Sequence, residues 1–401
     1  MAFSGAAPPK QPPLPSSDSH RRQESNKFLL HFAGGEKTST DPMHEVGDRR
    51  RGSKRYLLLL GINYMFLFVG SVSSSLLSKF YFIHKGSSRW VSTLVQSAGF
   101  PLLLPAVFLP YYVFQSTQRR PFSRFTSQIF VVSVIIGFLL GLNNLLFSWG
   151  NSYLPVSTNS LLLSTQLVFT LITSMIIVKQ KVTFANLNCV ILLTLSSVLL
   201  ALSSGHDKPE GLTRAKFFFG FFSTVGAGLL FALYLPVMER VYAKVYCYAM
   251  VVEMQLVMEV AATAFSVVGM AASGGFGEMK AEMEREFDLG PRAYCLTVAF
   301  NLVTWQLCFM GTAGMVFLTT SLTGGICMTA LMTVNVLGGV LVYRDHFGGS
   351  KAVSTALCVW GFCSYVYGMY MKSKEDAGED KTAAQSSESS MEMGEIVTHN
   401  G

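Results

Sequence analysis

Long apolar runs constrain the fold of this chain more than any other feature. Between Lys54 and Lys374 they follow one another, separated by short clusters of charged residues. Each is long enough for the roughly 20 residues with which an α-helix crosses a hydrocarbon core of about 30 Å. Because such a core holds no water to bond exposed peptide groups, runs of this length must satisfy their own backbone as helices. The pattern predicts an all-α protein embedded in a membrane.

The composition agrees with a membrane protein. Half of the 401 residues are hydrophobic and 14% are charged, whereas soluble domains carry about a quarter charged residues. The net charge of +7 does not indicate nucleic-acid binding, because the basic residues lie at the ends of apolar runs and no soluble domain remains to form a basic groove. The seven cysteines form no CxxC pair and nearly all lie inside apolar runs. We therefore expect neither a metal site nor a disulfide framework.

Polar tails flank the membrane domain at both ends. Residues 1–50 are rich in Pro, Ser, Gln, Gly and charge, and residues 373–401 are similarly polar. Such segments cannot bury enough apolar surface to offset the entropy of the chain, so we expect both tails to be disordered. The first tail lacks the apolar region of a signal peptide, so the first helix of the domain at 51–372 is expected to act as its own insertion signal.

Ten membrane helices are predicted within this domain. We place them at roughly 55–77, 90–114, 127–149, 153–178, 183–203, 215–238, 246–270, 293–312, 315–342 and 351–371. Pro101, Pro105 and Pro110 predict a kink or an interruption in the second helix. Gly137 and Gly141 share a helix face and would let a neighbouring backbone approach closely.

The distribution of basic residues predicts the orientation of the helices. Lys and Arg are slightly more frequent on the side that holds both tails, and a basic cluster precedes the first helix, which usually dominates topology. The members of this cluster are Arg49, Arg50, Arg51, Lys54 and Arg55. Both tails are then cytoplasmic.

The number of helices raises the possibility of an internal duplication. Ten helices split into five and five, and an odd number in each half requires the second half to insert upside down. The segments 158–181 and 323–346 are weakly similar, with Lys179 aligned to Arg344 and Thr170 to Asn335. Inverted repeats place a substrate site near the middle of the membrane, at the interface between the halves.

Polar side chains that share a helix face inside a membrane are costly and are therefore candidates for function. The fourth helix carries such a stripe in Asn159, Gln166, Thr170 and Thr173, and the eighth carries Thr297, Asn301, Trp305, Cys308 and Thr312. Other helices add amides near mid-depth. The candidate substrate-binding residues are Asn63, Gln96, Asn143, Asn159, Gln166, Asn301, Trp305 and Asn335.

The seventh helix contains two acids, Glu253 and Glu259. They lie about 120° apart around the helix, so we expect one of them to face a cavity, with Glu259 preferred because it shares a face with Gln255 and Thr263. An acid inside a membrane must be protonated, paired or hydrated, which would suit proton coupling. Both acids are candidates for this role.

A competing interpretation stays open for every one of these groups, namely that they hydrogen-bond packed helices together. If instead they line a cavity, apolar and aromatic walls with a few placed amides suit a small planar ring, on which Trp305 could stack. Nothing in the sequence resembles a nucleophile with its base, a Walker loop, a metal cluster or an HExxH motif. Neither an enzyme, nor an ATP-driven pump, nor a cofactor is indicated.

Five blocks of sequence resemble the plant purine permease family. They are Trp90-Val-Ser-Thr-Leu-Val-Gln-Ser-Ala-Gly, Asn144-Leu-Leu-Phe-Ser-Trp-Gly-Asn-Ser-Tyr-Leu-Pro-Val-Ser-Thr, Val178-Lys-Gln-Lys-Val-Thr-Phe-Ala-Asn-Leu-Asn, Trp305-Gln-Leu-Cys-Phe-Met-Gly-Thr-Ala-Gly and Phe347-Gly-Gly-Ser-Lys-Ala-Val-Ser. The resemblance extends over roughly 54–372. One departure is Arg344, at a position where members often keep a small residue.

The resemblance implies a drug/metabolite transporter fold, with ten helices in two inverted five-helix repeats. It also implies secondary, proton-coupled transport of purine bases, cytokinins or similar nitrogen heterocycles, with the plasma membrane as the expected location. A transporter of the same fold for another solute, such as an alkaloid, a vitamin-like ring or a nucleotide sugar in an internal membrane, is the alternative. A nucleotide sugar would require inward-facing Lys or Arg, and none lies between the predicted helix ends. A third class is a receptor or scaffold that transports nothing.

Overall fold

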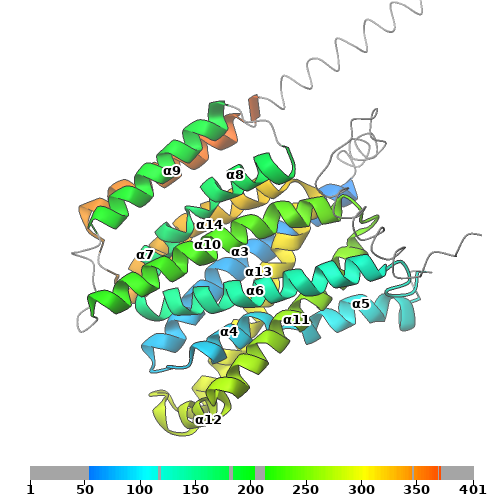
Figure 1. The fold of residues 1–401 in the computed structure, drawn as a ribbon, viewed down its shortest axis with the longest axis horizontal. Coiled ribbons are helices and arrows are strands. Elements are labelled where there is room, and N and C mark those ends of the chain that lie inside the picture. The colour runs from blue at the N-terminus through cyan, green and yellow to red at the C-terminus, as the bar shows by residue number, and fades with distance from the viewer. Residues whose placement is uncertain are drawn as a thin grey trace, which may run out of the picture. The chain divides into compact units, whose positions relative to one another are not determined.

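The computed structural model describes residues 54–115, 119–179, 184–203, 213–345, 347–368 and 370–371. All contacts reported below lie within the unit formed by residues 58–401. Every regular element in the described ranges is a helix (Figure 1). The tails predicted at 1–50 and 373–401 lie outside these ranges.

Eight helical segments of the described chain are long and apolar enough to cross a membrane, which makes this a multi-pass membrane protein. They are α3 (Lys54–Ile83), α4 with α5 (Arg89–Ser97, Leu103–Tyr112), α6 (Ser127–Tyr153), α7 with α8 (Val156–Leu163, Gln166–Ile177), α10 (Arg214–Tyr242), α11 (Tyr248–Ser273), α13 (Gly290–Leu318) and α14 (Ser321–Tyr343). Helix α9 (Phe184–Ser203) and a C-terminal helix over 349–368 coincide with the predicted fifth and tenth segments.

Hydroxyl side chains begin four of the helices. Ser88, Thr126, Thr213 and Thr320 are the N-caps of α4, α6, α10 and α14, and each accepts a hydrogen bond from the backbone N–H three residues later. This bond satisfies a donor that the first helical turn leaves free. The four caps explain where these helices start.

The predicted border between the eighth and ninth helices, at 312–315, is wrong. Helix α13 continues to Leu318, and Thr320 then caps α14. Gly314 lies inside α13 against α3, where a Cβ would collide with the side chain of Asn63. Gly314 therefore allows α13 to pack closely against α3, and the chain turns between Leu318 and the N-cap Thr320.

Two of the membrane segments are interrupted. The second breaks after Ser97 and passes through a 3₁₀ turn at Phe100–Leu102, as the prolines predicted. The fourth, predicted as one helix, breaks at Ser164 and Thr165, whose hydroxyls donate to the carbonyl oxygens of Leu161 and Leu162 at 2.6 and 2.7 Å. Such back-bonding competes with the helical pattern.

Helix α6 lies between α10 and α11 (Figure 1) and contacts both along much of its length. A Cβ on Gly137 would collide with the carbonyl oxygen of Met258 in α11, and one on Gly141 would lie 2.8 Å from the ring of Phe265. The prediction that these glycines permit close approach is confirmed.

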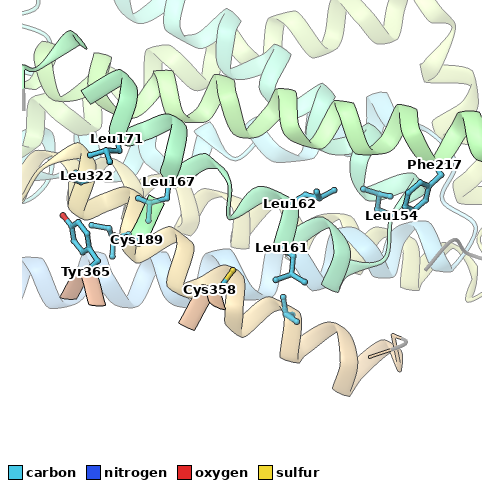
Figure 2. Packing of buried hydrophobic residues seen from close by; sticks show 12 residues of the cluster. Leu154, Leu161, Leu162, Leu167, Leu171, Cys189, Phe217, Leu322, Cys358 and Tyr365 are labelled. Carbon is cyan, nitrogen blue, oxygen red and sulfur yellow. The ribbon is translucent and has the colours of Figure 1, made fainter. Parts of the chain in front are cut away.

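An apolar cluster joins the fourth segment to the last helices of the chain. Leu161 and Leu167 pack in it with Cys189 of α9, Leu322 of α14 and Cys358 of the C-terminal helix (Figure 2). Hydrogen bonds also connect α9 directly to the C-terminal helix. The cluster holds the flank of the bundle together without contributing to the cavity described below.

Between α11 and α13, where no helix was predicted, lie a short helix α12 (Gly275–Ala281) and a π-helical turn η2 (Glu282–Glu286). The carboxylate of Glu282 is fully buried and accepts hydrogen bonds from the backbone N–H groups of Ser87 and Ser88 and from the Tyr81 hydroxyl, at 2.8, 2.6 and 2.6 Å. This buried acid fastens η2 to the α3–α4 connection.

Candidate functional site

A cavity lies among α3, α4, α6, α7, α8, α10, α13 and α14. About 510 Å³ of space separates its lining atoms, counting space continuous with the surroundings. Its polar lining consists of Ser71, Ser74, Ser75, Gln96, Asn143 and Gln166. The larger apolar groups are Phe147, Phe231, Trp305, Phe309, Met328 and Met332.

The amide of Gln96 is held in one orientation. Its Nε2 donates to the carbonyl oxygens of Ser92 and Asn144, both at 3.1 Å, and to the hydroxyl of Ser148 at 2.8 Å. Its Oε1 is buried and has no hydrogen-bond partner in the described part of the chain. Three acceptors thus fix the amide nitrogen and leave the oxygen available at the cavity.

Two more amide atoms at the cavity are also without a partner. The Nε2 of Gln166 and the Oδ1 of Asn143 are buried, and neither has a hydrogen-bond partner among the residues that the structure describes. Gln166 is the first residue of α8 and lines the cavity. An unmet buried polar atom costs about 1–3 kcal/mol. The cavity therefore offers two acceptors and one donor that a ligand could satisfy.

Trp305 supplies an aromatic wall. Its Nε1 donates to the Ser78 hydroxyl at 3.2 Å, which fixes the indole edge. Phe147 packs edge-on against it with ring centroids 5.2 Å apart, and Phe309 stacks on it with centroids 5.5 Å apart. Both contacts are arrangements that aromatic pairs prefer. The structure thus places Trp305 where the predicted stacking could occur.

Asn335 lies one hydrogen bond behind the lining, and Asn301 lies two hydrogen bonds behind it. The Ser78 hydroxyl is 3.3 Å from both side-chain polar atoms of Asn301 and also receives the bond from Trp305. Asn335 Nδ2 donates to the hydroxyl of Ser75, which lines the cavity, at 3.1 Å. These two amides support the wall and do not line it.

Asn63 and Asn159 are elsewhere and bond packed helices together, as the competing interpretation held. Asn63 accepts from the Tyr248 hydroxyl at 2.7 Å. Asn159 accepts from the Thr224 hydroxyl at 2.7 Å and donates to Asn151 Oδ1 at 3.3 Å. Asn159 contacts Thr224 of α10, and Gln166 packs against Gly228 four residues further along the same helix, so both face α10 but only Gln166 lines the cavity.

Glu259 is fully buried in a nest of amides. Its Oε1 accepts from Gln255 Nε2 at 2.9 Å and from Gln306 Nε2 at 3.1 Å, and its Oε2 has no partner in the described chain. Gln306 follows Trp305 in α13, and its side chain lies against Gly99 of the interrupted second segment. The acid is therefore next to the cavity wall and not in it.

Glu253 has a basic partner. Arg119 Nη2 lies 2.9 Å from its Oε2, and the Glu253 side chain is almost completely buried. Arg119 also donates to the sulfur of Cys247. Among the cavity-lining residues that the structure describes, neither Glu253 nor Glu259 is present, so the expectation that one acid faces the cavity is not met.

Sequence reasoning missed the serines of α3 and the phenylalanines of the cavity. The sequence did contain a signal for the serines, since Ser71, Ser74 and Ser75 interrupt an otherwise apolar run. No sequence signal distinguishes Phe147 or Phe231 from the many lipid-facing phenylalanines. Their role becomes visible only when α6, α10 and α13 are brought together.

The cavity is electrically neutral. No Lys, Arg, Asp, Glu or His is among its described lining residues, and no group of three or more His, Cys, Asp or Glu in the described ranges is placed to hold a metal ion. A bundle of membrane helices around a neutral cavity with polar and aromatic walls defines a membrane transport protein for small molecules.

Comparison with known proteins identifies the family. Residues 58–375 match a family model described as purine nucleobase transmembrane transport. The chain is similar to probable purine permease 4 of Arabidopsis thaliana, with 63% identity over 79% of this chain and 84% of that protein. It is also similar to purine permease 3 of the same plant, with 35% identity over 82% and 95% of the two chains. The chain belongs to the purine permease family, whose members are transporters and not enzymes.

A solved structure shares the fold. It is described only as "Crystal structure of protein" and matches 77% of this chain and 98% of its own length, with a TM-score of 0.50 and 14% identity. At this identity the likeness concerns the fold alone.

Proposed function

We propose that this protein carries purine bases, cytokinins or similar nitrogen heterocycles across the membrane by secondary active, proton-coupled transport. The observation that carries the proposal is the set of three unpartnered amide atoms, on Gln96, Asn143 and Gln166, beside the ring of Trp305. A planar ring with N–H donors and ring-nitrogen acceptors at its edge would satisfy all three while its face stacks on the indole.

The neutral lining favours an uncharged ring over a phosphorylated solute. A nucleotide sugar would need Lys or Arg at the cavity to pair its phosphates, and none is found in the described lining. Lys79 lies within α3, which extends beyond the predicted end at 77, but its Nζ donates to the carbonyl oxygens of Asn151 and Leu154 at 3.2 and 2.8 Å. This lysine is engaged at the end of the helices, away from the cavity.

Glu259 is the residue that we assign to proton coupling. Its Oε2 has no partner in the described ranges, so a proton on this oxygen would disturb no existing bond. Its Oε1 is bonded to Gln306, the chain neighbour of Trp305. A change of its protonation would therefore be transmitted to the cavity wall through one amide. The ion pair with Arg119 makes Glu253 the weaker candidate.

We further propose that the membrane domain consists of ten helices in two inverted halves of five. In each half, a charged side chain near the end of the first helix hydrogen-bonds a backbone group at the junction between the third and fourth helices. In the first half Lys79 Nζ donates to Leu154 O at 2.8 Å, and in the second Glu239 Oε2 accepts from Ser321 N at 2.8 Å. The cation lies at a helix C-terminus and the anion at a helix N-terminus, as the helix dipole favours.

The ends of the fourth and ninth helices support the same duplication. Lys179 and Arg344, aligned in the sequence, have φ angles of 57° and 53° and end their helices in the left-handed conformation. Such a terminus accommodates a glycine at least cost. The adjacent Asp345 accepts two hydrogen bonds from Ser157, both at 3.0 Å.

The plasma membrane is the location that we propose, with both tails on the cytoplasmic side and the transporter domain over 51–372. The basic cluster before the first helix supports this orientation.

Uptake of labelled adenine into a yeast strain that lacks its own purine uptake tests the proposed function. We expect saturable uptake that falls when a proton uncoupler is added and that unlabelled adenine suppresses. An absence of uptake for adenine and for every related ring, with the protein present in the plasma membrane, would refute it.

A further inference from the structure

Two loops reach from one half of the proposed duplication to the other. If residues 54–203 and 213–371 form the two halves, each loop lies between the second and third helices of its own half. The first loop, at 119–126, precedes α6, and the second, at 274–289, contains α12 and η2. The first contacts the beginning of α11, whereas the second follows the end of this helix, as α12 does in Figure 1. The two loops therefore lie at opposite ends of a membrane helix.

The first loop is held at the beginning of α11. Arg119 pairs with Glu253 at 2.9 Å and donates to the sulfur of Cys247, the N-cap residue of α11, at 3.0 Å. Phe122 of the same loop packs against an apolar cluster that includes Val252 of α11. A charged side chain and an aromatic ring of the first half are thus fastened to the second helix of the other half.

The second loop is held in the same way at the beginning of α4. Glu282 accepts hydrogen bonds from the backbone N–H groups of Ser87 and Ser88, and Ser88 is the N-cap of α4. Phe287 packs in an apolar cluster with Val91 of α4. Here too, a charged side chain and an aromatic ring of one half are fastened to the second helix of the other.

An accessible ion pair crosses between the halves beside Glu282. His84 Nδ1 lies 2.9 Å from Asp288 Oδ1, and the two side chains are 23% and 38% exposed. His84 follows α3 of the first half, and Asp288 belongs to the second loop. These two positions can therefore be altered while the buried carboxylate of Glu282 keeps its bonds.

The cavity lies between the two halves. Its lining comes from α3, α4, α6, α7 and α8 of the first half and from α10, α13 and α14 of the second. Transport requires that such a cavity opens to each side of the membrane in turn, by movement of one half against the other. Each opening separates the halves at one end of α11, so the contacts between the halves at that end must break.

We propose that the two loops are the gates of this transporter. The contacts of Arg119 close the cavity on one side of the membrane, those of Glu282 close it on the other, and each set breaks once in every transport cycle. Both sets are intact in this structure. This inference rests on the proposed function, because it takes the halves to move against each other during transport. In the proposed orientation the gate at Arg119 faces the cytoplasm.

The test cross-links each gate with a short bifunctional thiosulfonate, which a reducing agent removes. Arg119→Cys is paired with the native Cys247 at one gate, and His84→Cys with Asp288→Cys at the other, each in a variant whose remaining cysteines are alanine. We expect either cross-link to abolish adenine uptake into proteoliposomes. Reduction of the same sample should restore uptake, so the substitutions themselves do not enter the comparison.

Binding distinguishes a closed gate from a damaged site. Adenine should still raise the thermal midpoint of purified protein that is cross-linked at one gate, because the other gate still opens. Protein cross-linked at both gates should no longer respond to added adenine.

Met283→Cys paired with the native Cys295 is the matched control. Met283 lies in the second loop and Cys295 in α13 of the same half, with their sulfurs 3.9 Å apart. This cross-link fastens the loop to its own half, so uptake should be unchanged. Undiminished uptake with either gate cross-linked, or an equal loss in the control, would overturn the gates and leave purine transport intact.

If wild-type protein takes up no adenine, the proposed function fails, and spin labels then test the gates without a solute. Nitroxides at the two cysteines of each gate should show one population with strong dipolar broadening and a second without it. A single close population at both gates would overturn the inference.

Discussion

Replacing Gln166 by leucine tests whether its amide binds ligand or holds helices together. If Gln166 bonded packed helices together, its loss would destabilise the protein. In this structure its Nε2 is buried and unpartnered within the described chain, so the substitution breaks no bond of that nitrogen. We expect Gln166→Leu to weaken substrate binding without a loss of stability.

The magnitude follows from the hydrogen bonds involved. A neutral hydrogen bond contributes about 0.5–1.5 kcal/mol, which corresponds to a roughly two- to tenfold rise in the KM for adenine. Removing an unsatisfied buried donor relieves about 1–3 kcal/mol in the ligand-free protein. The thermal midpoint of the purified variant should therefore equal or exceed that of wild type.

Asn159→Leu is the matched control for this prediction. It removes the amide that accepts from Thr224 and donates to Asn151, and it lies outside the cavity lining. We expect the free energy of unfolding to fall by about 1–3 kcal/mol for each group left unpaired, which lowers the thermal midpoint. The KM for adenine should be unchanged. The assays are radiolabelled uptake in yeast and thermal unfolding in detergent.

Similar behaviour of the two variants would contradict a ligand-binding role for Gln166. A marked fall in the thermal midpoint of Gln166→Leu, with an unchanged KM in the fraction that reaches the membrane, would show that Gln166 holds helices together.

Three further predictions concern the aromatic wall, the buried acid and the helix packing. Trp305→Leu should raise the KM for adenine about five- to a hundredfold, because stacking of a base on an aromatic ring is worth about 1–3 kcal/mol. Trp305→Phe should keep most of the affinity. Equal losses of affinity in the two variants, measured by competition, would contradict stacking. Glu259→Gln should abolish both the stimulation of uptake at low external pH and the sensitivity of uptake to an uncoupler. Adenine should still stabilise the purified variant. Uptake by the variant that keeps the wild-type pH dependence would exclude Glu259 from proton coupling. Gly137→Ala should reduce the yield of folded protein, since the new Cβ would collide with the Met258 carbonyl and lie 2.7 Å from the Ala261 Cβ. Gly61→Ala is the control and should not reduce the yield, because no atom lies within 4 Å of its new Cβ. Equal yields of the two variants by size-exclusion chromatography would contradict the close packing.

The course of the helices was largely predictable, because lipid demands long apolar runs and a helix must satisfy its own backbone. The prolines of the second segment correctly predicted its interruption. The break at Ser164 and Thr165 was not foreseen, since these hydroxyls could equally have faced a neighbouring helix. Asn159 and Gln166 both face α10, as their spacing predicted, but Asn159 bonds Thr224 outside the cavity, and spacing alone does not distinguish the two roles.

The candidate site was predictable in residue type but not in detail. Gln96, Asn143, Gln166 and Trp305 reach one cavity, as costly polar groups in a membrane are expected to do. The structural amides have the same cost and the same spacing, and only their partners across helices distinguish them. Asn63, for example, is bonded by Tyr248, which lies 185 residues away in the chain.

A structure of the protein with adenine bound would show whether the ring occupies this cavity. We expect density for the ring between α6, α8 and α13, stacked on Trp305 and with its edge within hydrogen-bond distance of Gln96 Oε1 and Gln166 Nε2. Density at another place in the bundle, or a ring in this cavity that touches none of these groups, would contradict the proposed ligand site.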